Sequence, residues 1–213
     1  MVADLLSRVA NGRPPPEDGE VEVVPQPPGP VAAVLGFTGH HVIAADVDPA
    51  WVHRVLPPED LGAPLGATFL GALASRIGRR PGSLDVVLVA PRSDGDAPVE
   101  VVEVEPPDHP RVERARRYRH ELRVWQTADG AGLVIIGRGL GGRWEAALEV
   151  EPDARGAGLG RRLVAAGRHL VPGAHLWLAI APGNAMSLRA ALAAGFKPVG
   201  AEVLMSDRAP KHR

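Results

Sequence analysis

Apolar and polar positions in the first half of the chain change their spacing several times, and each spacing predicts a different element. Strands are expected where apolar residues run together or alternate, and helices where they recur three and four apart. The predicted elements are a short helix within 1–12, one long strand or two strands joined around Gly39 within 31–48, helices at 49–55 and near 66–78, and strands at 83–91 and 99–106. The helix at 49–55 has the clearest start, because Asp48 can cap it and Pro49 suits its first position.

The second half follows a more regular order of elements. The predicted elements are a helix through Val112, Ala115, Tyr118 and Leu122, strands at 121–127, 132–140 and 143–150, a helix from Leu159 to Leu170, a strand at 175–181, a helix at 186–195 and a final strand or strand pair at 196–205. Asp129-Gly130 and Gly141-Gly142 mark the two turns expected of hairpins. Three antiparallel strands followed by β-α-β-α-β predict an α/β fold, with an α+β mixed sheet.

Proline separates the first helix from the rest of the pattern. Residues 13–30 carry proline too densely for a helix, and only Glu20–Pro25 is extended in pattern. The predicted organisation is a tail and proline-rich linker at 1–30, an α/β half at 31–107, a second half at 108–206 and a C-terminal tail at 207–213. The linker could also be a segment draped over a surface.

Composition narrows the class of protein. Apolar residues at 45% and charged residues at 23% are ordinary for a globular protein, and 213 residues suffice for one large domain or two small ones. The net charge of −1 argues against nucleic acid or an acidic membrane as partner. The lack of cysteine excludes disulfides and cysteine–zinc sites. Without a signal peptide or an apolar run of about 20 residues, a cytoplasmic protein is expected. The excess of arginine, glycine and proline suggests a GC-rich bacterial genome.

Two glycine clusters are candidates for binding a phosphate group. Gly137–Gly142 matches G-x-G-x-x-G, but the residues after it alternate like a strand, which favours a hairpin over a nucleotide site. Arg155–Gly160 instead lies between the end of a strand and the start of a helix. The first N–H groups of a helix lack internal partners and attract anions, and glycine lets an anion approach them. A purely structural glycine turn is the alternative.

The run V-x-x-x-x-R-G-x-G-L-G-R-x-L, from Val150 to Leu163, resembles the acyl-CoA-binding signature of the GNAT superfamily of N-acyltransferases. A second block resembles the same family, with Asn184, a short helix and then Gly195-Phe196 in the expected order. The resemblance extends over about residues 120–205.

The resemblance implies a GNAT-type fold whose central sheet is splayed, so that the pantetheine arm of acetyl-CoA, or of a related acyl-CoA, lies between two parting strands. The arm would pair with backbone groups of one strand as an added strand does, and the glycine loop would hold the pyrophosphate. The implied cofactor-binding residues are Leu148, Val150, Arg155, Gly156, Ala157, Gly158, Gly160, Arg161 and Asn184. No metal is expected. Residues 31–107 either complete this fold or form a degenerate sister half.

The catalytic residues are less clear, because two positions depart from the family pattern. The usual glutamate position is Trp144, and the usual tyrosine position near the cofactor sulfur is Ala191. Glu145 is the first candidate for the general base and Glu149 the second, both on the strand face opposite Trp144. A solvated glutamate or a water relay to bulk solvent is the alternative in each case.

A cluster of arginines and a pair of adjacent histidines are further candidates for binding. The arginines at 111, 114, 116, 117 and 119 could attract an acidic substrate, although a solvated helix face is favoured. His40 and His41 are expected on opposite faces of a strand and not as a metal pair.

The function predicted from these features is an N-acyltransferase. It would transfer an acetyl or other acyl group from acyl-CoA to a primary amine by direct attack. The acceptor would be a small-molecule or peptide amine that the sequence does not identify, and a homodimer is compatible with the resemblance. The alternatives are a non-catalytic coenzyme-A sensor and an α/β interaction module.

Overall fold

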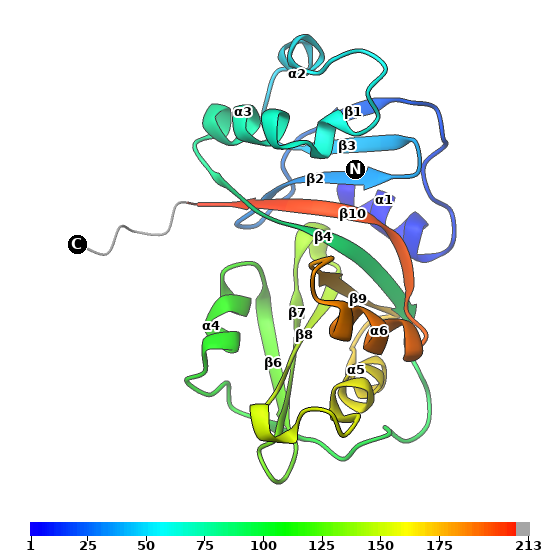
Figure 1. Cartoon of the computed structure of the whole chain (residues 1–213), viewed down its shortest axis with the longest axis vertical. Helices are drawn as coiled ribbons and strands as arrows, with labels where there is room; N and C mark the ends of the chain where they lie inside the picture. The colour runs from blue at the N-terminus through cyan, green and yellow to red at the C-terminus, as the bar shows by residue number, and fades with distance from the viewer. Residues whose placement is uncertain (208–213) are drawn as a thin grey trace, which may run out of the picture. The chain divides into compact units, whose positions relative to one another are not determined.

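The computed structural model describes residues 1–207, which form a mixed α/β fold of two compact units (Figure 1). Unit 1 contains residues 1–86 and 199–207, and unit 2 contains Val87–Pro198. The predicted fold class is therefore confirmed. The predicted C-terminal tail lies outside the described residues, apart from residue 207. None of the helices within 1–207 combines the length and the apolar character needed to cross a membrane.

The two units are not consecutive in the chain. The chain leaves unit 1 within β4 (Arg80–Pro91) and returns to it within β10 (Lys197–Ser206). This division is not the one drawn at 107/108 from the sequence. The spacing of apolar residues indicates that 197–206 is a strand but not which strands it pairs with, because strand pairing is decided by contacts distant in sequence.

Unit 1 contains a small sheet and three helices. Its elements are α1 (Val2–Ala10), β1 (Val21–Val24), β2 (Ala32–Phe37), β3 (His40–Ala44), α2 (Pro49–Val55), a 3-10 turn (Ala63–Leu65) and α3 (Ala67–Ile77). The strands lie in the order β1-β3-β2-β10, and only β1 and β3 pair in parallel. Phe69 and Leu73 of α3 pack with Val34, Ile43 and Met205 in the buried core.

The proline-rich segment belongs to unit 1 as an ordered part of it. Within it, β1 pairs with β3, with Val21 opposite His41. Asp18 lies against the buried His40, whose Nδ1 is 2.8 Å from Asp18 Oδ1. Residues 13–30 thus carry the extended strand that the alternation at 20–25 predicts, and they lie against the unit's sheet.

Unit 2 is built on an antiparallel run of strands followed by two α/β steps. Its elements are β5 (Val102–Val104), α4 (Pro110–Arg116), β6 (His120–Gln126), β7 (Gly132–Arg138), a 3-10 turn (Leu140–Gly142), β8 (Trp144–Val150), a 3-10 turn (Pro152–Ala154), α5 (Leu159–Leu170), β9 (His175–Ile180) and α6 (Ala185–Ala193). The strands lie in the order β9-β8-β7-β6-β5, and β5 to β8 are antiparallel. The order agrees with the predicted succession of hairpins and β-α-β units.

Helices cover both faces of this sheet (Figure 1). Val112 and Ala115 of α4 pack against one face in a cluster that includes Leu133 and Ala147. On the other face, Leu163 of α5 occupies the space in front of Gly132, where a side chain would lie within 2.7 Å of it. The β8 residues therefore divide into an α4 side and an α5 side according to their parity.

Helix α4 is shorter than the spacing of apolar residues predicts. It ends at Arg116, and the chain is already extended at His120, with Glu121 at φ 51° beside a break in the strand register. Leu122 packs on the same cluster as Val112, but from a strand. The helical spacing of apolar residues continues as far as Leu122, although Leu122 lies in a strand. The prediction of a longer helix was wrong because Leu122 faces the core under both the helical and the strand periodicity.

Candidate functional site

The sheet of unit 2 parts between β8 and β9, as the resemblance implies. The two strands are parallel and share a single ladder pair, between Glu145 and Trp177. Beyond this pair, β8 continues for five residues to Val150 without another ladder partner on its β9 side in the described part of the chain. The second half of β8 therefore carries backbone groups that no neighbouring strand satisfies.

Strand geometry identifies those groups. In an antiparallel ladder, alternate residues direct both backbone polar groups to the same neighbour. Glu151 N–H donates to Ala131 O at 2.9 Å, so the odd-numbered residues at this end of β8 face β7. Leu148 and Val150 consequently direct their N–H and C=O groups to the β9 side, the edge at which the resemblance expects a cofactor to pair.

The glycine loop follows directly at the end of β8. Gly156 and Gly158 adopt φ 86° and φ 76°, and Gly158 is the residue before the first turn of α5. These left-handed angles strain any residue with a Cβ. A Cβ at Gly156 would meet no atom within 4 Å, so the backbone angle and not crowding favours glycine there. The loop is exposed from Arg155 to Gly158.

The loop and the first turn of α5 present a row of main-chain donors. The first helical bond is Arg162 N–H to Gly158 O at 3.2 Å, and Gly158 has no side chain to cap the helix. Among residues 1–207, no acceptor is found for the N–H groups of residues 156 to 161. Arg155 is not part of this row, because its N–H donates to Pro152 O at 3.3 Å. Six successive donors at a positive helix end form an arrangement that suits an anion.

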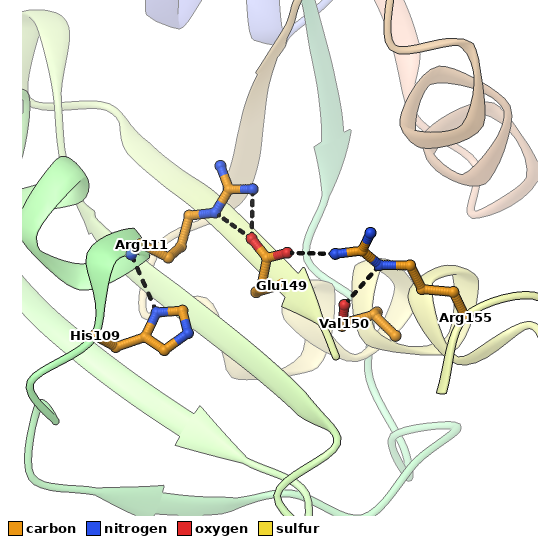
Figure 2. Close-up of polar contacts among 5 residues, drawn as sticks. All are labelled: His109, Arg111, Glu149, Val150 and Arg155. Atoms are coloured by element: carbon orange, nitrogen blue, oxygen red, sulfur yellow. Dashed lines mark hydrogen bonds and ion pairs between the residues drawn. The ribbon is translucent and has the colours of Figure 1, made fainter. Parts of the chain in front are cut away.

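Glu149, the second candidate base, lies between two arginines on the α4 side of β8 (Figure 2). Arg111 Nε and Nη2 donate to its Oε2 at 2.9 and 2.6 Å, and Arg155 Nη2 donates to its Oε1 at 3.2 Å. The side chain of Glu149 is 25% exposed. Both carboxylate oxygens of Glu149 thus accept charged hydrogen bonds from arginine.

Arg111 is itself held by the start of α4 (Figure 2). His109 is the residue before this helix, and its Nδ1 accepts the N–H of Arg111 at 3.0 Å. Of the arginines at 111–119, two therefore bind carboxylates of β8, since Arg119 donates to Glu145. The expectation of a solvated basic face is wrong for Arg111 and Arg119, because a sequence pattern does not show which strand the helix covers.

Glu145, the first candidate base, is buried in an ion cluster. Its side chain is 1% exposed and accepts from Arg119 Nε at 2.8 Å, from Arg143 Nε at 2.7 Å and from Leu140 N at 3.3 Å. Burial alone would raise the pKa of Glu145, but the guanidinium groups of Arg143 and Arg119 outweigh it and hold the pKa below its usual value. A buried carboxylate between two cations is suited to a structural role.

The first glycine cluster is explained by the same ion cluster. The run from Gly137 to Gly142 forms the turn between β7 and β8, as predicted. A Cβ at Gly139 would lie 2.2 Å from Glu145 Oε1, and one at Gly137 would lie 2.4 Å from a methyl group of Leu122. These glycines leave room for side chains of the protein itself, whereas a Cβ at Gly156 would meet open space.

The second block of the resemblance forms the start of α6. Asn184 caps this helix, and its Oδ1 accepts from Ser187 N at 3.1 Å. Ala191, at the usual tyrosine position, is fully buried and has no proton to give. The only tyrosine of the chain, Tyr118, follows α4. No group of three or more metal-binding side chains occurs within residues 1–207.

Comparison with models of known protein families gives no match, and comparison with curated protein sequences gives none either. Among solved structures, the chain is similar to a GCN5-related N-acetyltransferase from Kribbella flavida, at 16% identity and TM-score 0.41, covering 67% of this chain and 65% of that one. It is similar to a putative GNAT-family acetyltransferase from Novosphingobium aromaticivorans, at 20% identity and TM-score 0.40, covering 62% and 69%. A tandem GNAT protein from the clavulanic acid biosynthesis pathway matches at 16% identity and TM-score 0.39, covering 82% of this chain and 63% of that one.

The names of these similar structures contain GNAT or GCN5-related. The chain spans just under two thirds of the length of the Kribbella protein. At these identities and TM-scores the likeness carries no detail of a site. The function is therefore argued from the residues of β8, the glycine loop and α5.

Proposed function

We propose that the chain binds an acyl-CoA, acetyl-CoA foremost, at the glycine loop and transfers the acyl group to a primary amine. The observation that carries this proposal is the row of six N–H donors from Gly156 to Arg161 without an acceptor among the described residues, shortly after a strand edge from which β9 has parted. A diphosphate has several acceptor oxygens and negative charge, the two properties that such a helix start favours. Arg161, exposed in the first turn, adds positive charge.

The strand edge would take the rest of the cofactor. Leu148 and Val150 direct backbone donors and acceptors to the side of β8 where β9 has parted, and an amide-bearing pantetheine arm can pair with such an edge as an added strand. Asn184 uses its Oδ1 for the helix cap, so its Nδ2 amide is the group that it would offer to the arm. In this arrangement Leu148 and Val150 contribute backbone groups, and Asn184 contributes its side-chain amide.

The chemistry supplied by the bound acyl-CoA is a thioester carbonyl open to attack by an amine. The protein has to accept a proton from that amine and to stabilise the developing oxyanion. Glu145 is assigned a structural role, since it is enclosed between Arg119 and Arg143. Glu149 is the carboxylate reachable from solvent, and we propose that it, or water beside it, receives the proton.

Binding without transfer is the second candidate function. Both oxygens of Glu149 accept from arginine, and Ala191 stands where a proton donor to the leaving thiolate is expected. A chain with an intact cofactor loop, whose candidate base is bound by two arginines, has the properties of a coenzyme-A sensor. The acceptor in the catalytic case is a small-molecule or peptide amine.

Calorimetric titration with acetyl-CoA tests the shared part of both functions. We expect saturable binding by the wild-type chain and loss of binding by Gly158→Glu, which places bulk and negative charge at the helix start. Gly158→Lys is the matched control, because it carries the same backbone strain with the opposite charge and should bind more tightly than Gly158→Glu. Undetectable wild-type binding at millimolar acetyl-CoA would discard the proposal.

A panel of amines then separates the two candidates. Release of free thiol from acetyl-CoA is measured with aminoglycosides, polyamines, amino acids and peptides bearing a free N-terminus. Thiol release that depends on one class of amine supports transfer and identifies the acceptor class. Saturable binding with no release for any amine supports the sensor.

A further inference from the structure

The side chain of Arg155 turns away from the open donors of the glycine loop. It lies back along the end of β8, where Nε donates to Val150 O at 2.9 Å and Nη2 donates to Glu149 Oε1 at 3.2 Å (Figure 2). Its backbone N–H is also occupied, by Pro152 O. Neither the main chain nor the guanidinium of Arg155 is thus directed as a phosphate ligand would be.

The carbonyl that Arg155 occupies is a particular one. Val150 is the last residue of β8, and it is one of the even-numbered residues whose backbone groups are directed to the side from which β9 has parted. A donor on Val150 O at 2.9 Å takes the place that an N–H of an added strand would take. Under the proposed function, that added strand is the pantetheine arm.

We propose that the Arg155 guanidinium acts as an internal substitute for the pantetheine amide and has to leave Val150 before an acyl-CoA arm can pair there. This inference rests on the proposed function and deepens it. Arg155 is then a positioning residue that competes with the arm of the cofactor. A role as phosphate ligand predicts the opposite sign for its removal.

Glu149 holds the guanidinium in this position. Arg111 uses two nitrogens on Oε2 of Glu149, which leaves Oε1 directed to Arg155 (Figure 2). The Arg155 side chain is 54% exposed, so water screens this ion pair and the contact with Val150 can exchange. A screened hydrogen bond between Arg155 and Val150 O would contribute about 1 kcal/mol. Competition with this bond would lower the affinity for the acyl-CoA arm about fivefold.

The test compares two ligands that carry the same phosphates. Coenzyme A has the pantetheine arm, and adenosine 3′-phosphate 5′-diphosphate lacks it. Calorimetry is run with the wild-type chain and with Arg155→Ala, Arg155→Lys and Arg162→Ala. The control Arg162→Ala removes an equal charge from a guanidinium that donates to Ala157 O of the loop and not to the strand edge. Thermal unfolding of each variant checks that it is folded.

The readout is the ratio of the two affinities, with Arg162→Ala as the reference for a general loss of positive charge. We expect Arg155→Ala and Arg155→Lys to raise the ratio of coenzyme A to adenosine 3′-phosphate 5′-diphosphate affinity about fivefold, and Arg162→Ala to leave it unchanged. An equal loss for both ligands in Arg155→Ala, recovered by Arg155→Lys, would overturn the inference in favour of a phosphate role. An unchanged ratio in Arg155→Ala would overturn it also.

Failure of the proposed function has a different signature. If neither the wild-type chain nor Arg155→Ala binds either ligand, the cofactor assignment itself is wrong and the inference falls with it. If Arg155→Ala binds coenzyme A and the wild-type chain does not, the competition is supported, since the wild-type guanidinium then excludes the arm.

Discussion

Two strand-to-helix junctions in this chain are β3 to α2 in unit 1 and β8 to α5 in unit 2. They differ in whether the protein supplies a side-chain acceptor for the first N–H groups of the helix. At the first, Asp48 Oδ1 accepts the N–H of Ala50 at 2.9 Å, and Pro49 removes one donor altogether. At the second, Gly158 has no side chain to offer, and the donors from Gly156 onward are left without an acceptor among the described residues. The helix that supplies its own carboxylate is closed to an anion, and the helix that does not is open to one.

Other helices of unit 2 support this contrast. His109 Nδ1 caps α4, and Asn184 Oδ1 caps α6. The glycine start of α5 therefore departs from its neighbours in the same unit, and the difference lies in one side-chain acceptor. Substitutions at Gly158 and at Asp48 test the contrast between α2 and α5 directly, and substitutions at Glu145 and Asn184 test the elements beside the α5 junction.

The largest effect is expected at Glu145, which holds the beginning of β8 in place. Glu145→Gln leaves Arg143 and Arg119 buried near a neutral group, and we expect the free energy of unfolding to fall by about 3–5 kcal/mol. Denaturant unfolding measures this loss. Glu121→Gln is the control, because that glutamate is 59% exposed and its removal should cost no more than about 1 kcal/mol. A loss of less than 1 kcal/mol in Glu145→Gln would show that the cluster does not support β8.

The Glu145 carboxylate should also make the free energy of unfolding depend on pH in the acid range. The pKa of Glu145 is lower in the folded chain than its ordinary value, because two guanidinium groups outweigh the cost of burial. Its contribution is therefore present in full above the unfolded-state pKa of about 4.3 and is lost as the pH falls through the lower folded-state pKa. Unfolding at a series of pH values should show this slope in the wild-type chain, and a shallower slope in Glu145→Gln.

The next largest effect is expected when the start of α5 is given a side-chain acceptor like that of α2. Gly158→Asp would place a carboxylate within reach of the N–H groups of the first turn of α5, as Asp48 does in α2. We expect the affinity for acetyl-CoA to fall about tenfold or more. Gly158→Asn has a similar shape and tolerates a left-handed φ, so it separates strain from charge. Equal affinities for the two variants would contradict an electrostatic role of this helix start.

The reverse exchange, at Asp48, should affect stability alone. Asp48→Ala removes the acceptor for Ala50 N–H and should lower the free energy of unfolding by about 1 kcal/mol. No acyl-CoA binding should be gained, because α2 follows no glycine loop. Asp96→Ala, at an exposed position, is the comparison for a general loss of negative charge. A second binding event in the calorimetry of Asp48→Ala would show that an uncapped helix start is sufficient.

The smallest effect is expected at Asn184. Asn184→Asp retains the oxygen that caps α6, replaces the Nδ2 donor with a second oxygen and adds a negative charge, so the cap should be kept and acetyl-CoA affinity should fall about threefold. Asn184→Ala loses both groups and should also lower the unfolding free energy by about 1 kcal/mol. If Asn184→Asp binds acetyl-CoA as the wild type does, the residue is a cap and nothing more.

The local elements and the position of the glycine loop can be predicted from the sequence. Helix α2 has the bounds expected from Asp48 and Pro49, α3 ends before Gly78, and the turns at Asp129-Gly130 and Gly141-Gly142 join strands as expected. Caps, turn residues and periodicity act over a few neighbouring residues, so a sequence pattern contains them. The end of α4 was missed because helical and strand spacing coincide at Leu122.

The pairing of charged side chains, in contrast, depends on the folded structure. Arg111 binds Glu149 across 38 positions, and Arg119 binds Glu145 across 26. The direction of the Arg155 side chain, back to Val150, depends on where the Glu149 carboxylate is held. The placement of β10 in unit 1 is likewise a long-range choice. Such pairings are selected by burial and strand packing of the whole fold, since the energy of an ion pair depends on the surroundings into which folding brings it.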